Sequence, residues 1–196
     1  ILNSDLKMEV IVNYIYLDET ERKIFAEARH EYLIEQTQFN GIQHFYNLDN
    51  IIQLHFRNCI KDIYWVVEHD KNLYLRDRNN YSLYNSQNSN NPIKKTNILI
   101  NNVKLIEYDG IYTNYIIPYE KYQSTPSDGI NTYSFGLDNN NYQPSGALNF
   151  SMLSNARMKI EVDEHYLQFP NKKILVFANS YNILRIMSGM AGLAFI

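Results

Sequence analysis

The sequence predicts an all-β fold, an antiparallel β-sandwich or jelly roll with one short helix in a connection and long surface loops. Three observations predict it. Apolar and polar residues alternate through much of the chain, which is the pattern of strands with one buried face. Roughly ten such segments follow one another, separated by turn-forming residues. Helical patterns do not alternate with them, as a parallel α/β fold would require.

The first strand is expected over residues 6–16, where every second residue is apolar and Lys7, Glu9 and Asn13 lie on the opposite face. Two segments, residues 63–67 and 174–178, are apolar on both faces, which is typical of strands in the middle of a sheet. The same alternation as in the first strand predicts three further half-buried strands: residues 52–57, 132–137 and 158–163.

One helix is expected between the first two strand segments. Asp18 can cap its first turn, and Glu21 stands three residues later, as in a capping box. Ile24, Phe25 and Ala28 then form an apolar stripe. We expect this helix to pack on an end or a flank of the sandwich.

Three polar stretches are expected to be loops. Residues 77–96 are rich in Asn and Ser and contain Pro92, which predicts a long exposed loop. Residues 124–129 and 138–146 have the composition of turns. Asparagine is abundant throughout, and it suits turns because it tolerates left-handed backbone angles.

Composition and motifs give no support for catalysis. The net charge of −3 provides no basic surface for nucleic acid. The five histidines show no metal-ligand spacing, and Cys59, the single cysteine, has no partner at a catalytic spacing, so a buried and inert thiol is expected. We therefore expect no enzyme, no cofactor and no metal. A cupin-type enzyme, with a metal site assembled from distant residues, stays a third possibility.

No apolar run approaches the ~20 residues that cross a bilayer, so no membrane insertion is expected. The 17 tyrosines and one tryptophan allow a different function, a lectin-like carbohydrate-binding module. Trp65, however, lies in the doubly apolar residues 63–67, where burial is expected rather than a sugar-stacking platform. The lectin-like module is kept as the alternative function.

Several segments carry a resemblance to a known family. The most specific are Q-P-S-G-A-L-N-F-S at residues 143–151 and N-I-L-R-I-M-S-G-M-A-G-L-A-F at residues 182–195. In these and in shorter pieces, taken in order, the chain resembles the C-terminal jelly roll of the major capsid proteins of nucleocytoplasmic large DNA viruses. It departs from the family at Asn58-Cys59, where His-Pro is common, and at Ala191, where the family has glycine.

The resemblance implies that residues 1–196 form a single jelly-roll domain, the C-terminal half of a double jelly-roll subunit whose upstream jelly roll is absent from this chain. The lack of an initiator Met agrees with that expectation. Such subunits form homotrimers with a pseudo-hexagonal outline, which tile an icosahedral shell. The implied partners are other capsid subunits, neighbouring capsomers and minor capsid proteins, without direct contact to nucleic acid. The implied location is the virion, after assembly in the host-cell cytoplasm.

The resemblance also implies a set of structural signature residues. Pro144 and Gly146 are expected to shape a turn, and Gly189 a tight bend rather than a phosphate-binding loop. Residues 77–96 are expected on the outer face or at a seam between subunits. The full set is Trp65, Pro144, Ser145, Gly146, Asn149, Phe150, Arg185, Ser188, Gly189 and Gly192.

Overall fold

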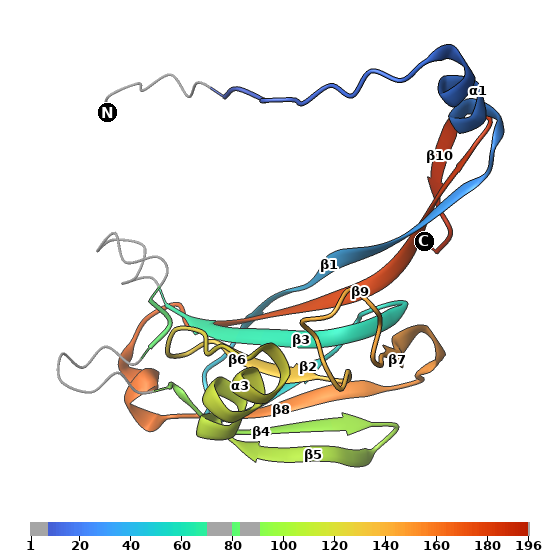
Figure 1. Ribbon diagram of the computed structural model, residues 1–196. Helices are drawn as coiled ribbons and strands as arrows, with labels where there is room; N and C mark the ends of the chain where they lie inside the picture. The colour runs from blue at the N-terminus through green and yellow to red at the C-terminus, as the bar shows by residue number, and fades with distance from the viewer. Residues whose placement is uncertain (1–7, 70–79, 83–90, 196) are drawn as a thin grey trace.

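The computed structural model describes residues 8–69, 80–82 and 91–195, which fold around two antiparallel sheets (Figure 1). The larger sheet has the strand order β1 (His30–His44), β9 (Lys173–Met187), β3 (Cys59–Glu68), β6 (Asn131–Ser134). The smaller sheet has the order β2 (Asp49–Gln53), β8 (Ala156–Val162), β4 (Ile93–Ile100), β5 (Val103–Asp109).

Two short strands extend the larger sheet: β7 (Leu148–Asn149) pairs with β3, and β10 (Met190–Leu193) pairs with β9. Every strand pairing among the described residues is antiparallel. Along the chain, successive long strands mostly alternate between the two sheets, which is jelly-roll connectivity. The predicted fold class is confirmed.

The core fills the space between the sheets. In β8 every second residue is buried, as the alternation of residues 158–163 predicted. Strand β3 is buried on both faces, as predicted for residues 63–67. Strand β9 does lie between β1 and β3, but its residues 175 and 177 are only half-buried. The largest fully buried side chains are Trp65, Tyr166, Ile60, Ile63, Ile93, Ile98, Met158, Ile160 and Ile174.

Asparagine shapes the turns, as expected. Strands β4 and β5 are joined by Asn101 and Asn102, whose φ angles of 50° and 66° define a two-residue hairpin turn with both residues left-handed. Asn58 and Asn171 also have positive φ. A tight left-handed turn favours residues whose short side chains tolerate that conformation.

Strands β1 and β9 are much longer than their neighbours. They pair with each other from His44 and Lys173 to His30 and Ile186, whereas β3 accompanies β9 only as far as Tyr181. Beyond that point β1, β9 and β10 continue as a narrow ribbon that projects from the sandwich (Figure 1). We call residues 19–34 and 182–195 the arm.

The helix α1 (Glu19–Glu27) lies at the tip of the arm (Figure 1). Its predicted cap is confirmed, because the Asp18 carboxylate accepts a hydrogen bond of 2.7 Å from the Glu21 N–H. Its predicted packing is wrong. None of its residues is buried, and Ile24 and Phe25 are 57% and 53% exposed, because the arm holds the helix away from both sheets.

The strand predicted over residues 6–16 is also wrong for this domain. Residues 8–16 are extended and exposed, and they pair with no strand of the described chain; residues 1–7 lie outside the described part. The alternation is present, but this domain offers the segment no sheet to join. Figure 1 shows it running back from α1, well clear of the larger sheet.

Two further differences concern residues 77–122. Strand β4 begins at Ile93, so the predicted loop ends earlier than residue 96; of its remainder, only residues 80–82, 91 and 92 are described. The π-helical turn η1 (Tyr112–Ile116) and helix α3 (Ile117–Tyr122) were not expected. Pro118 suits the first turn of α3, where no backbone N–H is needed. Short 3₁₀ turns, η2 (Phe150–Met152) and η3 (Glu164–Gln168), flank β8.

Candidate assembly surface

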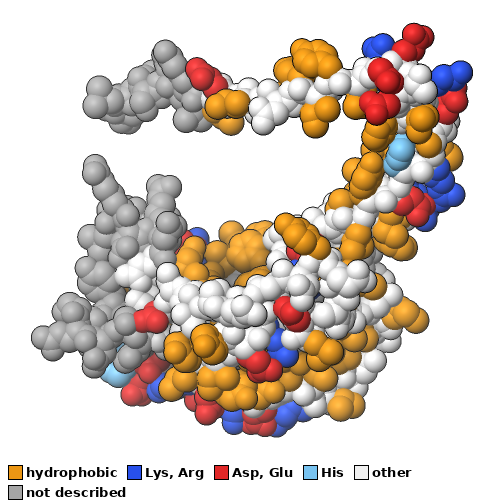
Figure 2. Space-filling model, in the orientation of Figure 1, with side chains coloured by type: hydrophobic (Ala, Val, Ile, Leu, Met, Phe, Trp, Pro, Cys, Tyr) orange, Lys and Arg blue, Asp and Glu red, His pale blue; other side chains and the backbone are white. Residues whose placement is uncertain are grey.

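The arm exposes large apolar side chains along most of its length. Figure 2 shows hydrophobic side chains gathered along the N-terminal segment and the arm. A narrow ribbon of two or three strands is marginally stable in water unless something packs against it. A contiguous apolar surface of this kind marks an interaction site. The exposed residues are Ile24, Phe25, Tyr32, Leu33, Met187, Met190, Leu193 and Phe195.

The hairpin at the end of the arm depends on two signature residues. Ser188 and Gly189 connect β9 to β10 with φ angles of 52° and 76°, which is the two-residue turn that matches strand twist. The tight bend expected at Gly189 is therefore present. Gly192 lies within β10 with open space around it, and nothing in this structure explains a glycine there.

A third signature residue, Arg185, joins the two long strands of the arm. It stands directly opposite Glu31 in the pairing of β1 with β9, and its Nε lies 3.0 Å from a Glu31 carboxylate oxygen. The Arg29 guanidinium donates a hydrogen bond of 2.5 Å to the same oxygen. This hydrogen bond, with the charge of Arg185, lowers the pKa of Glu31. The cluster is exposed, so it stabilises the arm only slightly.

Asn182 fixes the C-terminal segment at the base of the arm. Its side chain is 1% exposed, and its Nδ2 donates to the carbonyl of Phe195 and to Gln36 Oε1, both at 2.7 Å. Its Oδ1 accepts from the Phe195 N–H at 3.2 Å. The chain thus closes back on β9 after β10 ends. The sequence patterns did not identify Asn182. A usable signal was present, because Asn182 continues the series of every second residue that begins at residue 174, and a polar residue in a buried series needs hydrogen-bond partners.

A hollow of about 260 Å³ lies where the arm meets the sandwich. It brings the two most specific signature segments together, because Asn149 and Ser151 line it with Asn182, Ile183 and Phe195. Cys59 also lines this hollow and is exposed, so the prediction of a buried thiol is wrong. Cys59 stands at the first position of β3, and burial on that strand begins only at the next residue.

The Q-P-S-G segment closes a loop after β6. Ser145 Oγ accepts from the Asp138 N–H at 3.0 Å and donates to the Asp138 carbonyl at 2.5 Å, which joins the two ends of the loop. Gly146 has φ of 152°, and a Cβ there would lie 2.9 Å from the Phe135 carbonyl oxygen. Pro144 is exposed at the turn. The loop therefore requires serine and glycine for geometric reasons.

The N-F-S part of that segment joins the loop to the core. The Asn149 side chain caps η2 by accepting from the Ser151 N–H at 3.1 Å. The buried Phe150 ring packs edge-on against Phe56 and Phe135. Trp65 is fully buried in β3, on the face that packs in the core, and it lies outside the arm. It cannot serve as a sugar platform.

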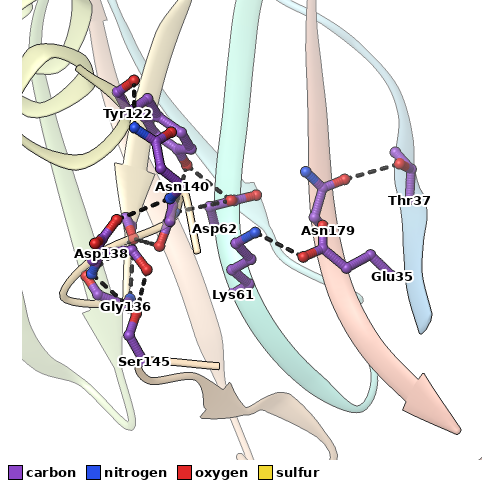
Figure 3. Close-up of polar contacts among 12 residues, drawn as sticks. Glu35, Thr37, Lys61, Asp62, Tyr122, Gly136, Asp138, Asn140, Ser145 and Asn179 are labelled. Carbon is purple, nitrogen blue, oxygen red and sulfur yellow. Dashed lines mark hydrogen bonds and ion pairs between the residues drawn. The ribbon is translucent and has the colours of Figure 1, made fainter. Parts of the chain in front are cut away.

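A polar network covers the outer face of the larger sheet (Figure 3). Asp62 of β3 is buried, and its Oδ2 accepts hydrogen bonds from Tyr122 Oη at 2.8 Å and Asn139 Nδ2 at 3.1 Å. Burial raises the pKa of the Asp62 carboxyl, while the Tyr122 hydrogen bond lowers it in part. Beside it, Lys61 Nζ binds Glu35 at 2.7 Å. The network holds α3 and the loop after β6 against β3.

A second hollow, of about 680 Å³, lies at the open side of the sandwich between β5 and β6. Its lining is mostly apolar, and its charged groups are already paired: Lys104 with Glu107, and Lys121 with Glu120. Such a lining offers contact area rather than converging catalytic groups. The apolar lining includes Val103, Leu105, Tyr108, Tyr133, Phe135 and Leu148.

The described residues contain no group of three or more His, Cys, Asp or Glu side chains that could hold a metal ion. His69 is buried and stacks on Phe169 at 4.3 Å, and His165 Nδ1 lies 2.7 Å from the Asp163 carboxylate. No helix in the described part of the chain is both long and apolar enough to cross a membrane.

A family model described as the large eukaryotic DNA virus major capsid protein matches residues 21–192. The chain belongs to this major capsid protein family. Its relatives include probable capsid protein 4 of Acanthamoeba polyphaga mimivirus, 32% identical over 94% of this chain and 38% of that protein. The major capsid protein of Pyramimonas orientalis virus is also 32% identical, over 94% of this chain and 48% of that protein.

Solved capsid structures share the fold. A quasi-atomic model of the PBCV-1 virus capsid matches with a TM-score of 0.76 and 26% identity, over 93% of this chain and 55% of that one. The Faustovirus major capsid protein matches in fold, with a TM-score of 0.70 at 14% identity, over 87% of this chain and 36% of that one. This capsid-family chain therefore spans about half, or less, of each of these proteins.

Family membership confirms the resemblance found in the sequence and the expectation that the chain is not an enzyme, because the matched relatives are capsid proteins. Apart from Trp65, which is buried in the core, the signature residues fall into two groups in this capsid domain. One group shapes the loop after β6 and its junction with the core, and the other shapes the arm. The two sequence segments that contain them, residues 143–151 and 182–195, meet at the hollow at the base of the arm, where Asn149 is the signature residue in the lining.

Proposed function

We propose that this chain is one of the two jelly-roll domains of a capsid subunit, and that three such subunits form a pseudo-hexagonal capsomer of an icosahedral shell. Residues 1–196 supply the C-terminal jelly roll. Family membership and the match to half of the PBCV-1 capsid chain support this proposal. The capsomers contact neighbouring capsomers and minor capsid proteins in the virion, and they assemble in the host-cell cytoplasm.

The observation that carries the proposal is the apolar surface of the arm. Leu33, Met190 and Leu193 are 51%, 72% and 40% exposed on a ribbon that has no layer packed on either side within the described chain. Burying apolar surface contributes about 25 cal/mol for each Å² removed from water. The arm is therefore stabilised when another domain or subunit covers it. Rigid strands and polar loops complete a structural unit suited to tiling.

The test is the mass of the full-length subunit in solution, measured by light scattering after size exclusion. We expect three times the subunit mass, and we expect Leu33→Asp together with Leu193→Asp to reduce that species at least about tenfold, because two charges then enter a covered apolar surface. Ile51→Asp is the matched control: Ile51 is 68% exposed but lies on β2, outside the arm. A monomeric wild type, or equal effects of both variants, would count against the proposal.

A further inference from the structure

The helical turn η1 and the helix α3 that continues it carry a group of exposed tyrosines. Tyr115 and Tyr119 are 58% and 63% exposed, and Tyr112 is 38% exposed. Tyrosine more often buries its ring and leaves its hydroxyl group in water. At these exposures ring carbons also contact water. Helix α3 lies on the flank of the sandwich, away from the arm (Figure 1), so this group is a separate surface.

The tyrosine rings are aligned with one another. Tyr115 and Tyr119 stand four residues apart, with their ring planes within 5° of parallel and their centroids 6.5 Å apart. Tyr112 stacks on Tyr108 of β5, with 4.6 Å between the centroids and 17° between the planes. Rings that are held parallel offer aromatic faces of one orientation to a ligand. We call Tyr112, Tyr115 and Tyr119 the tyrosine platform.

The tyrosine platform rests on a fixed base. Thr113 is buried, and its hydroxyl donates a hydrogen bond of 2.8 Å to Asn131 Oδ1. Asn114 Nδ2 donates to the Ile130 carbonyl at 2.7 Å, and Ile117 is buried in the first turn of α3. Side chains that are already positioned lose less entropy when a ligand binds. The π-helical form of η1 is itself rare and is frequent at functional sites.

The chemistry of the surface favours a neutral ligand with hydroxyl groups. From Gly110 to Tyr119 no side chain carries a charge, and the next residue, Glu120, is paired with Lys121 at 3.2 Å. Within the described residues, the hydroxyl groups of Tyr115 and Tyr119 make no hydrogen bond. An apolar protein surface packed here would bury these hydroxyl groups without partners, which costs free energy.

We propose that the tyrosine platform binds a neutral, β-linked oligosaccharide. A pyranose ring with equatorial hydroxyl groups has two flat C–H faces and a rim of hydroxyl groups. The C–H faces stack on the tyrosine rings, because the face of an aromatic ring is the negative part of its quadrupole. The rim exchanges hydrogen bonds with the tyrosine hydroxyl groups. A β-linked chain keeps successive sugar rings in one extended row, which suits parallel rings. This binding is separate from assembly and does not rest on the proposed trimer.

The test is calorimetric titration of the full-length subunit with three β-linked hexasaccharides: cellohexaose, chitohexaose and xylohexaose. We expect saturable binding of at least one of them, with a Kd of about 1 mM or tighter. Saturation-transfer NMR on the same samples should show that the sugar contacts the protein through its ring C–H protons. The absence of saturable binding for all three sugars overturns the inference.

Variants locate the binding on the tyrosine platform. Tyr119→Ala removes an aromatic face and is expected to weaken binding at least about tenfold, whereas Tyr119→Phe keeps the face and is expected to weaken it about threefold. Tyr142→Ala is the matched control, since Tyr142 is fully exposed in the loop after β6, outside the platform. Equal losses for Tyr119→Ala and Tyr142→Ala overturn the inference.

The rival occupant of this surface is a second copy of the subunit. Light scattering on the same variants gives the oligomeric mass. A mass that falls in Tyr119→Ala, without oligosaccharide binding by the wild type, assigns the surface to an interface between copies and overturns the inference. An unchanged mass with lost sugar binding supports it. A wild type that is monomeric and binds the sugar contradicts the trimer and not the platform, so the two failures are distinguishable.

Discussion

The side chain of Asn182 binds both backbone groups of Phe195, accepting from its N–H at 3.2 Å and donating to its C=O at 2.7 Å. Asn182 thereby acts as a strand neighbour for a segment that has just left β10. The same Nδ2 also reaches Gln36 of β1. One buried amide therefore holds the C-terminal segment, the base of the arm and the larger sheet together.

Replacing this amide is expected to loosen the end of the chain. Asn182→Ala leaves buried partners without hydrogen bonds, which costs about 1–3 kcal/mol for such a group. Urea denaturation measures the loss in free energy of unfolding, and faster hydrogen exchange at the Phe195 amide would show that the C-terminal segment has loosened. Asn179→Ala is the matched control on the same strand, since Asn179 makes a single bond to Thr37 on the outer face. Equal losses for the two variants would contradict the role given to Asn182.

The hairpin turn at the end of the arm allows a comparison of two glycines. Gly189 has φ of 76°, so Gly189→Ala is expected to destabilise the arm by about 1 kcal/mol, the cost of a side chain in the left-handed region. Gly192 has open space and no positive φ, so Gly192→Ala is expected to change stability by less than about 0.5 kcal/mol. Thermal unfolding measures the melting temperatures of both variants. Equal decreases would show that the left-handed turn is not the cause of the destabilisation.

Much of the sandwich could be predicted because strand periodicity is a local property. The alternation in β8 and the doubly apolar run in β3 each identify a strand and its buried face. Residues 8–16 show the limit of the same argument. Period-two alternation says that a segment can join a sheet, but not which sheet, since the partner is fixed by tertiary contacts that the sequence pattern does not contain.

The buried carboxylate of Asp62 gives a pH dependence of stability. Burial raises its pKa above the ordinary 3.8, so the folded state holds this proton more tightly than the unfolded state. The stability contributed by this group is therefore greatest at low pH and is lost as pH rises through the raised pKa. Each tenfold difference in proton affinity corresponds to about 1.4 kcal/mol.

Asp62→Asn keeps an acceptor for Tyr122 and Asn139 but has no charge to bury. Relative to the wild type, this variant is expected to gain stability as pH rises. Urea denaturation of both proteins between roughly pH 4 and pH 8 measures the difference. Glu107, whose pKa is lowered to about 2 by Lys104 and Lys95, is present in both proteins and cancels in the comparison. Parallel pH profiles for the two proteins would rule out Asp62 as the source.

Cys59 is expected to react with a thiol reagent in the native 196-residue chain, at one thiol per chain and within about tenfold of the rate in denaturant, because its side chain is exposed at the base of the arm. In the assembled subunit, covering of the arm should slow this reaction. A colorimetric thiol assay measures both rates. Reaction only after unfolding would show that the arm closes over this residue in solution.

The candidate surface was less predictable than the fold. Ser145 and Gly146 were identified by resemblance. The contacts that explain these two residue types are the hydrogen bonds of Ser145 to Asp138 and the close approach of Gly146 to Phe135, and both form only in the folded loop. Cys59 was placed inside because a cysteine beside strong strand signals is usually buried. That expectation is wrong because Cys59 lies at the base of the arm. The alternation of apolar and polar residues does not show that two strands extend beyond their sheet.

A reconstruction of the capsomer by electron cryomicroscopy would show whether this domain is half of a subunit and whether its apolar arm is covered on assembly. We expect a three-fold particle with two jelly rolls in each subunit, in which Leu33, Met190 and Leu193 are buried. An assembly without three-fold symmetry, or a three-fold particle in which the arm still projects into solvent, would contradict this expectation.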